Sequence, residues 1–420
     1  MVKTPLGVRK YFKIVLNFEI PSDMIFLLIP AGLTLLFFIL IPGLGAFYTR
    51  SQWRGFRKNI IIASLTPLLT YPRLKRERDG FLGNYRFIGD LEAIQEDRIW
   101  LRNRKLAVSA DLKNGSVYVL PSYSFPADEG RVELNRETLP DEMPKRISWN
   151  RIFSLPEGTK IFLGGPLYSE GGMGVFKTDK STPLTVIIYD GTEETILRRA
   201  IWGGRQKNEY WNRFTPAALA AGALSLFIAG YIFLRSPYML HPAALSFTCS
   251  LIPAMIFAPP GVLFYLLYRY LWRKSRFLRA ERDVLQLPVR FFPNSRVREI
   301  RLPDGNLYSM KQVTDISTII ENPEYRDLKI RSSVLIEKVK RVEDGYSIFG
   351  VLDPTHPQDT PRKSSDPMVE YLLVPGDPEY LSWTCAKRAR RFEILAVGAY
   401  VAGLAGNFLL VFLAFLFLLR

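Results

Sequence analysis

The sequence predicts a polytopic α-helical membrane protein with four transmembrane helices and two β-rich (α+β) soluble domains. Three observations lead to this fold class. Four long stretches contain no Asp, Glu, Lys or Arg, the polar segments between them are rich in strand and turn signals, and the two halves repeat one order, helix–domain–helix. The charge-free stretches are residues 24–49, 214–234, 236–268 and 394–419. Each is longer than the roughly 20 residues that cross a bilayer core.

These stretches define the expected domain organisation. In chain order we expect a basic interfacial segment (1–23), transmembrane helix 1 (24–49), soluble domain 1 (50–213), transmembrane helix 2 (214–234), a short loop (235–242), transmembrane helix 3 (243–268), soluble domain 2 (269–393) and transmembrane helix 4 (394–419). The basic residues before the first stretch resemble those of a signal peptide, but 24–49 is too long for its apolar core and contains Pro30 and Pro42. We therefore expect a retained transmembrane helix.

Charge predicts the orientation. The chain carries 56 Lys and Arg against 40 Asp and Glu, a net charge of +16, and its cations cluster at the domain-side ends of the apolar stretches. Because Lys and Arg are retained on the cytoplasmic side, we expect a multi-pass protein of the cell (inner) membrane with cytoplasmic soluble domains. Four cations in the N-terminal segment argue for the opposite orientation: Lys3, Arg9, Lys10 and Lys13.

The same cations suggest partners. Anionic lipid headgroups attract clusters of this kind, and Trp prefers the headgroup level, so Trp53, Arg54, Trp272 and Arg273 are the candidate membrane-interface residues. The alternative is that the cations only determine topology. An unidentified protein partner and self-association into a homo-oligomer remain open. Nucleic acid is not expected, because the cations lie beside the spans and form no stripe on one fold.

The two halves read as a duplication. Pro42-Gly43 and Pro260-Gly261 lie near the ends of spans one and three, and Trp53-Arg54 and Trp272-Arg273 follow at almost the same spacing. Ordered coincidences of this kind indicate an internal repeat, with the second copy shortened by about 30 residues before its hairpin.

Turn and cap signals extend the correspondence. Asn114-Gly115 and Asp304-Gly305 each predict a two-residue type I′ hairpin, because both residue pairs tolerate positive φ. Near the ends of the domains, Thr192 and Asp377 occupy expected helix N-cap positions, with acidic residues in the first turn.

The residues within the four apolar spans are more typical of a packed helical anchor than of a transport pathway. Small residues at helical spacing in spans two and four predict close helix packing, and prolines in spans one and three predict kinks. No carboxylate lies in a span, which disfavours a coupled transporter. Asn407, the only strongly polar amide there, is expected to bond across helices.

No catalytic, cofactor or metal site emerges from the sequence. The glycine-rich run 164–174 lacks a Gly-Lys-Ser/Thr ending and is read as turns in a β domain. His356 lies in a proline-broken loop, a poor metal scaffold. The only cysteines, Cys249 and Cys385, cannot build a disulfide framework or a zinc finger.

One family resemblance is carried by the ends of the halves. Residues 348–352 (Ile-Phe-Gly-Val-Leu), 366–373 (Asp-Pro-Met-Val-Glu-Tyr-Leu-Leu) and 378–381 (Pro-Glu-Tyr-Leu), then a basic helix and a span, resemble the end of the GIDE (BAM) domain of mitochondrial E3 ubiquitin ligases and bacterial relatives. Residues 161–164, 183–189 and 193–199 echo it in the first half. The resemblance implies a membrane-flanked β-rich interaction domain. Ligase activity is not implied, because a RING needs a Cys/His zinc cluster.

The sequence therefore favours a non-enzymatic membrane scaffold that presents two duplicated β-rich domains to a protein or lipid partner. The alternative is a membrane-bound enzyme acting on a lipid or envelope precursor between the two domains. A channel or transporter that uses the kinked spans is a third, weaker hypothesis.

Overall fold

The computed structural model describes most of the chain and divides it into two compact units. Described are residues 22–70, 79–104, 106–113, 115–122, 142–148, 152, 154–179, 182–205, 209–293, 297–314, 329–330, 345–352 and 361–419. The helical unit comprises Met1–Arg50, Asn208–Trp272 and Ile394–Arg420, and the sheet unit comprises Ser51–Lys207 and Arg273–Glu393. The basic segment expected at 1–23 falls almost entirely outside the described residues, and so does the loop with His356.

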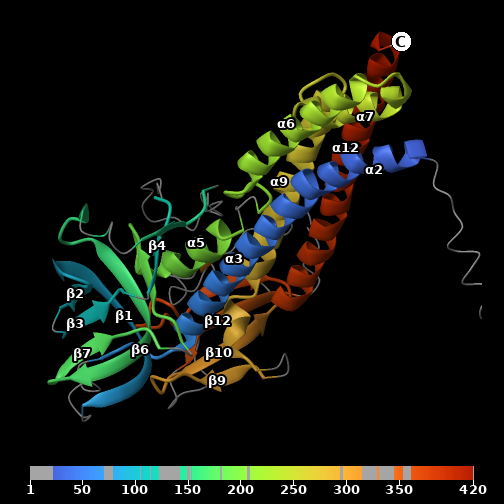
Figure 1. Ribbon diagram of the computed structural model, residues 1–420. Helices are drawn as coiled ribbons and strands as arrows, with labels where there is room; N and C mark the ends of the chain where they lie inside the picture. Colours follow the sequence, from blue (N-terminus) through green and yellow to red (C-terminus); the bar gives the residue numbers. More distant parts are fainter. Residues whose placement is uncertain are drawn as a thin grey trace, which may run out of the picture. The chain divides into compact units, whose positions relative to one another are not determined.

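The helices are named as in Figure 1. The α-helices are α2 (Ser22–Thr34), α3 (Ile41–Leu65), α5 (Ile196–Gly203), α6 (Thr215–Leu234), α7 (Leu240–Ser250), α8 (Ile252–Met255), α9 (Gly261–Leu285) and α12 (Pro378–Leu418). A π-helix, η1 (Leu35–Leu40), joins α2 to α3. Short 3₁₀ turns are η3 (Glu193–Thr195), η4 (Pro237–Met239) and η5 (Pro288–Phe291).

Three helices of the described chain are long and apolar enough to cross a membrane. They are Phe26–Leu65 (from α2 through η1 and α3), Thr215–Leu234 (α6) and Pro378–Leu418 (α12). The stretch expected as transmembrane helix 3, residues 243–268, is not one helix: α7 ends at Ser250, α8 ends at Met255 and α9 begins at Gly261. Two consecutive prolines, Pro259 and Pro260, supply no amide hydrogens there, so the helical ladder cannot continue.

Small residues bring the helices of the helical unit into close contact, as the sequence predicts for spans two and four. On α6, a Cβ at Gly222 would lie 2.5 Å from Phe37 Cβ, and one at Gly230 would lie 3.1 Å from the Phe247 ring. On α12, a Cβ at Gly403 would lie 2.6 Å from Phe264 Cβ. Aromatic side chains thus fill the room left by the missing methyl groups.

The first apolar helix is irregular at Pro42, and neighbouring side chains satisfy its carbonyls. Ile41 N–H donates to Leu36 O, five residues back, and Pro42 has no N–H for Phe38 O, four residues back. The Tyr210 hydroxyl donates to Phe38 O (2.9 Å), and Asn212 Nδ2 donates to Pro42 O (3.1 Å). In hydrocarbon an unsatisfied carbonyl would cost several kcal/mol.

At the break between α8 and α9, backbone amides and one side chain both donate to the carbonyls: Ala258 N–H donates to Met255 O (3.2 Å) and Val262 N–H to Ala258 O (3.2 Å). Asn407 Nδ2, on α12, donates to Met255 O (2.5 Å) and Ala258 O (2.9 Å). Gly261 lies against this amide, since a Cβ there would be 2.3 Å from Asn407 Nδ2. The expectation that Asn407 bonds across helices agrees with these contacts.

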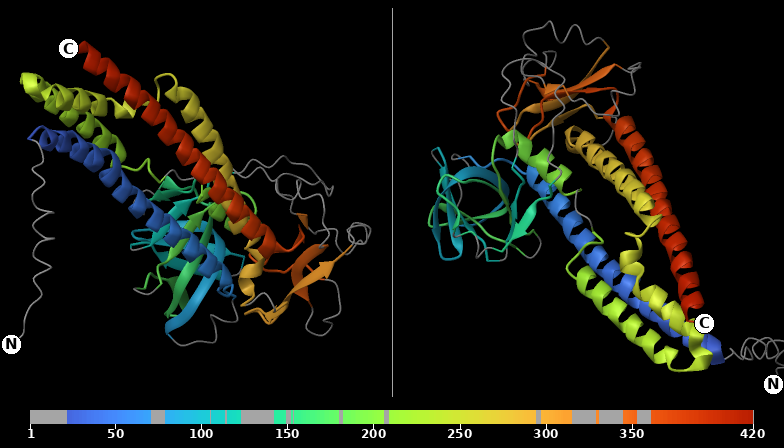
Figure 2. Two further views of the ribbon diagram at one scale, coloured as in Figure 1. Left: turned by 90° about the vertical axis from the view of Figure 1, so that its right-hand side faces the viewer. Right: turned by 90° about the horizontal axis from the view of Figure 1, so that it is seen from above.

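The first sheet of the sheet unit contains a closed ring of strands (Figure 2). Its strands are β1 (Gly80–Gln95), β2 (Arg98–Asn103), β3 (Leu106–Asp111), β4 (Ser116–Val119), β5 (Lys145–Ile147), β6 (Lys160–Glu170), β7 (Met173–Phe176) and β8 (Thr185–Ile188). Their order is β1-β2-β3-β7-β6-β8-β4-β5, and an added β1–β6 pairing closes β1-β2-β3-β7-β6 into a five-stranded barrel. Only the β3–β7 pair of this ring is parallel.

The second sheet is open. Its strands are β9 (Glu299–Arg301), β10 (Leu307–Val313), β11 (Lys329–Ile330), β12 (Tyr346–Leu352) and β13 (Leu372–Pro375), in the order β11-β13-β12-β10-β9. Both sheets share a four-strand order. In β1-β6-β8-β4 and in β10-β12-β13-β11 the first two pairings are antiparallel and the third is parallel.

The hairpin predictions fare differently in the two halves. The hairpin expected at Asn114-Gly115 is wrong: Asn114 is outside the described residues, and Gly115 leads into β4, which pairs with β5 and β8 and not with β3. Strand pairing there is decided by non-local partners, which a local turn signal does not report. The glycine-rich run instead supplies the type I′ signature, because β6 and β7 are joined by Gly171 (φ +58°) and Gly172 (φ +79°).

The second predicted hairpin is confirmed, with a different loop. β9 and β10 pair antiparallel, and Gly305 N–H donates to Leu302 O (2.9 Å). Among Pro303, Asp304 and Gly305 only Gly305 has positive φ, +94°. The loop is therefore a turn followed by a left-handed glycine, because Pro303 fixes a negative φ at its own position.

Helices cover the first sheet through one apolar cluster. On α3 the side chains of Trp53, Phe56, Ile60 and Ala63 recur at helical spacing and are buried together with residues of α5, α9 and the sheet. At Gly164 of β6 the sheet comes so close that a Cβ would lie 2.5 Å from Ala63 Cβ.

Of the two N-cap predictions, the one at Asp377 is confirmed, whereas the one at Thr192 is not. Asp377 caps α12, accepting from the amides of Glu379 (3.1 Å) and Tyr380 (3.3 Å). Thr192 makes no side-chain cap bond. The first turn after it is the 3₁₀ turn η3, in which the Thr192 carbonyl accepts from Thr195 instead.

Candidate functional site

The four residues expected at the membrane interface lie in different surroundings. Trp53, on α3, is only 8% exposed and packs against Phe56 and Tyr118, with ring centroids 5.5 and 6.3 Å away. Trp272, on α9, is half-buried beside Tyr268 (5.8 Å). Arg54 and Arg273 are exposed. Headgroup contact by these residues stays a prediction, and for Trp53 packing already accounts for the indole.

Several cations that flank the spans act inside the protein. Arg57 Nη1 donates to Gly204 O (2.9 Å), fully buried Arg199 donates to Asp190 O (2.6 Å), and Arg205 Nε donates to Asp283 Oδ2 (2.5 Å). The flanking cations that remain exposed are Arg50, Arg54, Lys58, Arg213, Arg269, Arg273, Lys274, Lys387, Arg388, Arg390 and Arg391. Among the described flanking cations, these are the most accessible to lipid or a partner.

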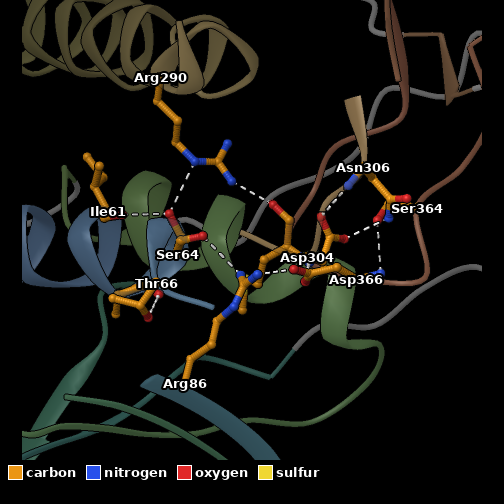
Figure 3. Close-up of polar contacts among 11 residues, drawn as sticks. Ile61, Ser64, Thr66, Arg86, Arg290, Asp304, Asn306, Ser364 and Asp366 are labelled. Carbon is orange, nitrogen blue, oxygen red and sulfur yellow. Dashed lines mark hydrogen bonds and ion pairs between the residues drawn. The ribbon is translucent and has the colours of Figure 1, made fainter. Parts of the chain in front are cut away.

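The strongest polar constellation of the sheet unit joins its two sheets (Figure 3). Arg86 of β1 is 3% exposed, and its backbone is held by the segment that follows α3. Arg86 N–H donates to Pro67 O (3.1 Å), and Leu69 N–H donates to Arg86 O (2.9 Å). The guanidinium donates to Ser64 O (3.0 Å) and forms an ion pair with Asp366, 280 residues away in sequence.

Arg290 reaches the same point from η5 (Figure 3). Its Nε donates to Ser64 Oγ (3.1 Å) and its Nη2 to Met368 O (2.6 Å). Its guanidinium also lies 4.3 Å from the Phe291 ring centroid and 4.0 Å from Glu370 Oε1. Ser64, at the end of α3, is therefore contacted by both arginines, one through its carbonyl and one through its hydroxyl.

The two acids balance the two arginines in a desolvated environment. Asp366 accepts from the Met368 amide (3.0 Å), and the carbonyl of Glu370 accepts from the buried Tyr308 hydroxyl (3.2 Å). Burial lowers the pKa of Arg86 to about 10, with the charge of Asp366 opposing that shift. Burial also raises the pKa of Asp366, against the attraction of Arg86. Breaking such a cluster costs more than building it gains, because one charge is left buried and unpaired.

A small cavity lies beside this cluster. Its volume is about 30 Å³, and its lining includes Glu194, Arg198, Lys363, Asp366 and Glu370. Lys363 Nζ and Glu194 Oε1 are 2.6 Å apart across it. The volume suits ordered water and is far below the several hundred Å³ of a small-molecule site. Within the described residues no group of three or more His, Cys, Asp or Glu is placed to hold a metal ion.

This constellation is absent from the sequence-based expectations. Arg86 and Arg290 belong to no motif, and Asp366 and Glu370 lie in the segment 366–373, which the sequence singles out only for its family resemblance. The partners of all four residues are remote in sequence. Nothing local in the sequence distinguishes Arg290 from the other cations. Comparison of the chain with protein-family models, with curated proteins and with solved structures gives no match.

Proposed function

We propose that this chain is an integral membrane scaffold that presents two duplicated β-rich domains at the membrane surface to a protein or lipid partner. Four crossings anchor it, and the domains face the cytoplasm at the cell membrane. The observation that carries the proposal is the union of both sheets in one compact unit through the buried Arg86–Asp366 and Arg290–Ser64 contacts.

That union supports a fourth crossing. Residues 51–207 and 273–393 belong to one unit and so share one side of the membrane. If α6 crosses once, the chain must cross back before residue 273. The broken segment α7–α8–α9 is the part of the chain available for the return, and backbone amides together with Asn407 donate to the carbonyls of Met255 and Ala258 at the break.

The dimensions and end groups of α6 fit a bilayer. Its 20 residues span about 30 Å, the thickness of the hydrocarbon core. Arg213 lies over the Phe214 ring (4.7 Å) at one end, and Arg235 lies over the Tyr231 ring (5.1 Å) at the other. Aromatic and cationic groups at both ends are typical of interfacial anchors.

The shared four-strand order supports the duplication. In both halves the second strand of that order carries an Ile-Phe pair, Ile161-Phe162 in β6 and Ile348-Phe349 in β12, and all four side chains are buried. Ile161 pairs with Ile188 of β8, and Ile348 pairs with Leu373 of β13. The predicted correspondence of the two hairpins is not part of this argument, since Gly115 does not lie in one.

The enzyme alternative would use the cavity between the two halves. Its acids and bases are engaged with one another, as in the Lys363–Glu194 and Arg86–Asp366 pairs. This favours a fixed junction over a poised acid–base site. The likeness to the GIDE domain implies the same kind of interaction role and stays a prediction.

Cysteine accessibility tests the topology. Cys249 and Cys385 are buried, so reporters must be introduced into a Cys249→Ser, Cys385→Ser background. Suitable exposed positions are Met173 (first half), Arg301 (second half) and Tyr238 (between α6 and α7). With a membrane-impermeant maleimide, Met173→Cys and Arg301→Cys should react only after permeabilisation, and Tyr238→Cys should react in intact spheroplasts.

The other labelling patterns have distinct meanings. Reaction of Met173→Cys and Arg301→Cys from opposite sides would contradict the fourth crossing. If Met173→Cys and Arg301→Cys react in intact spheroplasts and Tyr238→Cys reacts only after permeabilisation, the four crossings stand and the orientation is reversed.

A further inference from the structure

The first four turns of α12 carry an exposed stripe of aromatic and cationic side chains. Tyr380 and Trp383 are each 57% exposed and stack at 6.3 Å, and Lys387 Nζ lies 4.9 Å from the Trp383 ring centroid. Arg390 and Arg391 continue the same face one turn further and are exposed. These five residues are called the α12 stripe.

The opposite face of this helical segment is committed to the second core. Leu381, Cys385 and Ala389 are buried there with strands of the second sheet. Packing therefore fixes which way the helix faces, while the α12 stripe takes no part in it. Folding alone gives no reason for an exposed Trp and Tyr at adjacent turns.

The corresponding helix of the first half is covered. α5 also follows the last strand of its sheet, and all its residues except Arg198 are buried. Its Trp202 meets Phe277 of α9 edge-on at 5.0 Å. The two halves thus place a helix after the same strand, and only the second leaves an aromatic face open.

We propose that the α12 stripe docks an acidic segment of a partner protein that also carries apolar side chains. This inference rests on the proposed scaffold function and specifies its partner surface. Tyr, Trp and Arg are the residue types that dominate interface energetics, and three cations on one face select a negative partner. Arg390 and Arg391 form no ion pair with the described residues, so their charge is not already neutralised within that part of the chain.

Distance along the helix separates this partner from lipid. The charge-free stretch of α12 begins at Ile394, so Trp383 lies about 16 Å and Tyr380 about 21 Å beyond it along the axis. The headgroup layer on each side of a bilayer is only about 5–8 Å thick. Lipid phosphates can reach Arg390 and Arg391, but not the aromatic pair. A second copy of the same stripe is disfavoured by like charge.

The test uses the full-length protein in nanodiscs of phosphatidylcholine. The probe is a fluorescein-labelled peptide of Glu-Leu-Glu-Phe repeats, and its counterpart carries Lys in place of Glu. We expect binding of the acidic peptide only, weakened about tenfold by Trp383→Ala and abolished by the double change Arg390→Glu, Arg391→Glu. The matched control is Trp211→Ala, which removes an equally exposed Trp (58%) from the helical unit and should leave binding within about twofold.

Four results would overturn the proposal. They are no binding of the acidic peptide, equal binding of the Lys peptide, equal effects of Trp383→Ala and Trp211→Ala, and a dimer that Trp383→Ala dissolves. Shielding of a nitroxide at Trp383→Cys from aqueous relaxant on adding phosphatidylglycerol would assign the stripe to lipid and also reject a protein partner. The scaffold topology is tested independently by the cysteine pattern, so either hypothesis can fail alone.

Discussion

The two halves of the sheet unit share a four-strand order and differ in what surrounds it. In the first half the strands β2, β3 and β7 close a barrel, whose interior holds a large apolar cluster. In the second half the sheet stays open, and the Ile348 face is covered by a small cluster with Tyr371 and Leu373. The common strands therefore provide a frame, and the additions decide how deeply each half is buried and which surfaces remain open.

The sheet surfaces that pack against helices are more alike in the two halves than the opposite surfaces are. Phe162 is buried beneath α3 and α5, and Phe349 is buried beneath α9 and α12, both with no exposed surface. If the four shared strands contribute equally to stability in both halves, removing either side chain should lower the free energy of unfolding by a similar amount.

The largest expected effect tests that equality. Phe162→Ala and Phe349→Ala should each lower the free energy of unfolding by about 4 kcal/mol, because each removes a fully buried ring and leaves a cavity. Urea unfolding of the full chain in detergent, followed by circular dichroism, measures both. The control is Phe81→Ala, an exposed ring in β1 that should cost less than about 1 kcal/mol. A cost for only one of the two core variants would break the comparison.

The sequence predicts the parts of this architecture that depend on composition and local pattern. Charge-free stretches located three continuous apolar helices, and turn chemistry located the hairpin at Asp304-Gly305. The broken third stretch was signalled by Pro253, Pro259 and Pro260, but prolines in a span are equally compatible with a kink. The helix bounds distinguish the two, because the helix stops at Met255 and starts again at Gly261.

Non-local pairing explains the remaining differences. The barrel closes through β3 and β7, which lie some sixty residues apart, and a turn signal at Gly115 cannot report which strand β4 will join. The dipeptides Trp53-Arg54 and Trp272-Arg273 look alike in sequence, yet one Trp is a core residue beneath a sheet and the other is half-buried among aromatic neighbours. The Arg86–Asp366 pair spans 280 residues and leaves no local signature.

The second prediction concerns whether the halves unfold separately. Arg86→Ala should lower the free energy of unfolding by about 3 kcal/mol, because Asp366 would stay buried without its partner. Hydrogen exchange should rise in both sheets, although the substitution lies in the first. As a control, Arg102→Ala removes an exposed pair with Glu92 and should cost at most about 1 kcal/mol. Faster exchange in the first sheet alone would mean that the halves are energetically independent.

A third prediction compares the two irregular helices. Asn407→Ala and Asn212→Ala should each cost about 2 kcal/mol, because each removes a buried amide that donates to carbonyls outside its own turn: Met255 O and Ala258 O in one variant and Pro42 O in the other. Thermal unfolding in lipid nanodiscs measures the loss. Thr34→Ala, which removes only a bond to Pro30 O in its own helix, is the control and should have the smaller effect. Equal melting of Asn407→Ala and Thr34→Ala would show that the break needs no donor from α12.

The smallest effect asks which force governs the junction. Burial raises the pKa of Asp366 above its ordinary value of 3.8, while the charge of Arg86 opposes the shift. At pH values between the ordinary pKa of Asp366 and its raised pKa in the folded protein, the folded protein binds more protons than the unfolded chain. The contribution of Asp366 to the free energy of unfolding therefore falls as pH rises through this range. Asp366→Asn does not titrate. The difference in unfolding free energy, wild type minus variant, should therefore decrease as pH rises above 3.8 and level off once pH exceeds the folded pKa of Asp366.

The sign of that slope is informative in either direction. An increasing difference would mean that the folded pKa of Asp366 lies below 3.8, and hence that attraction to Arg86 exceeds the cost of burial. The pair would then hold the two sheets together by its own charge. With the expected decrease, the surrounding packing and the Ser64 contacts hold the sheets together. In that case the ion pair serves to keep two buried charges from opposing the union.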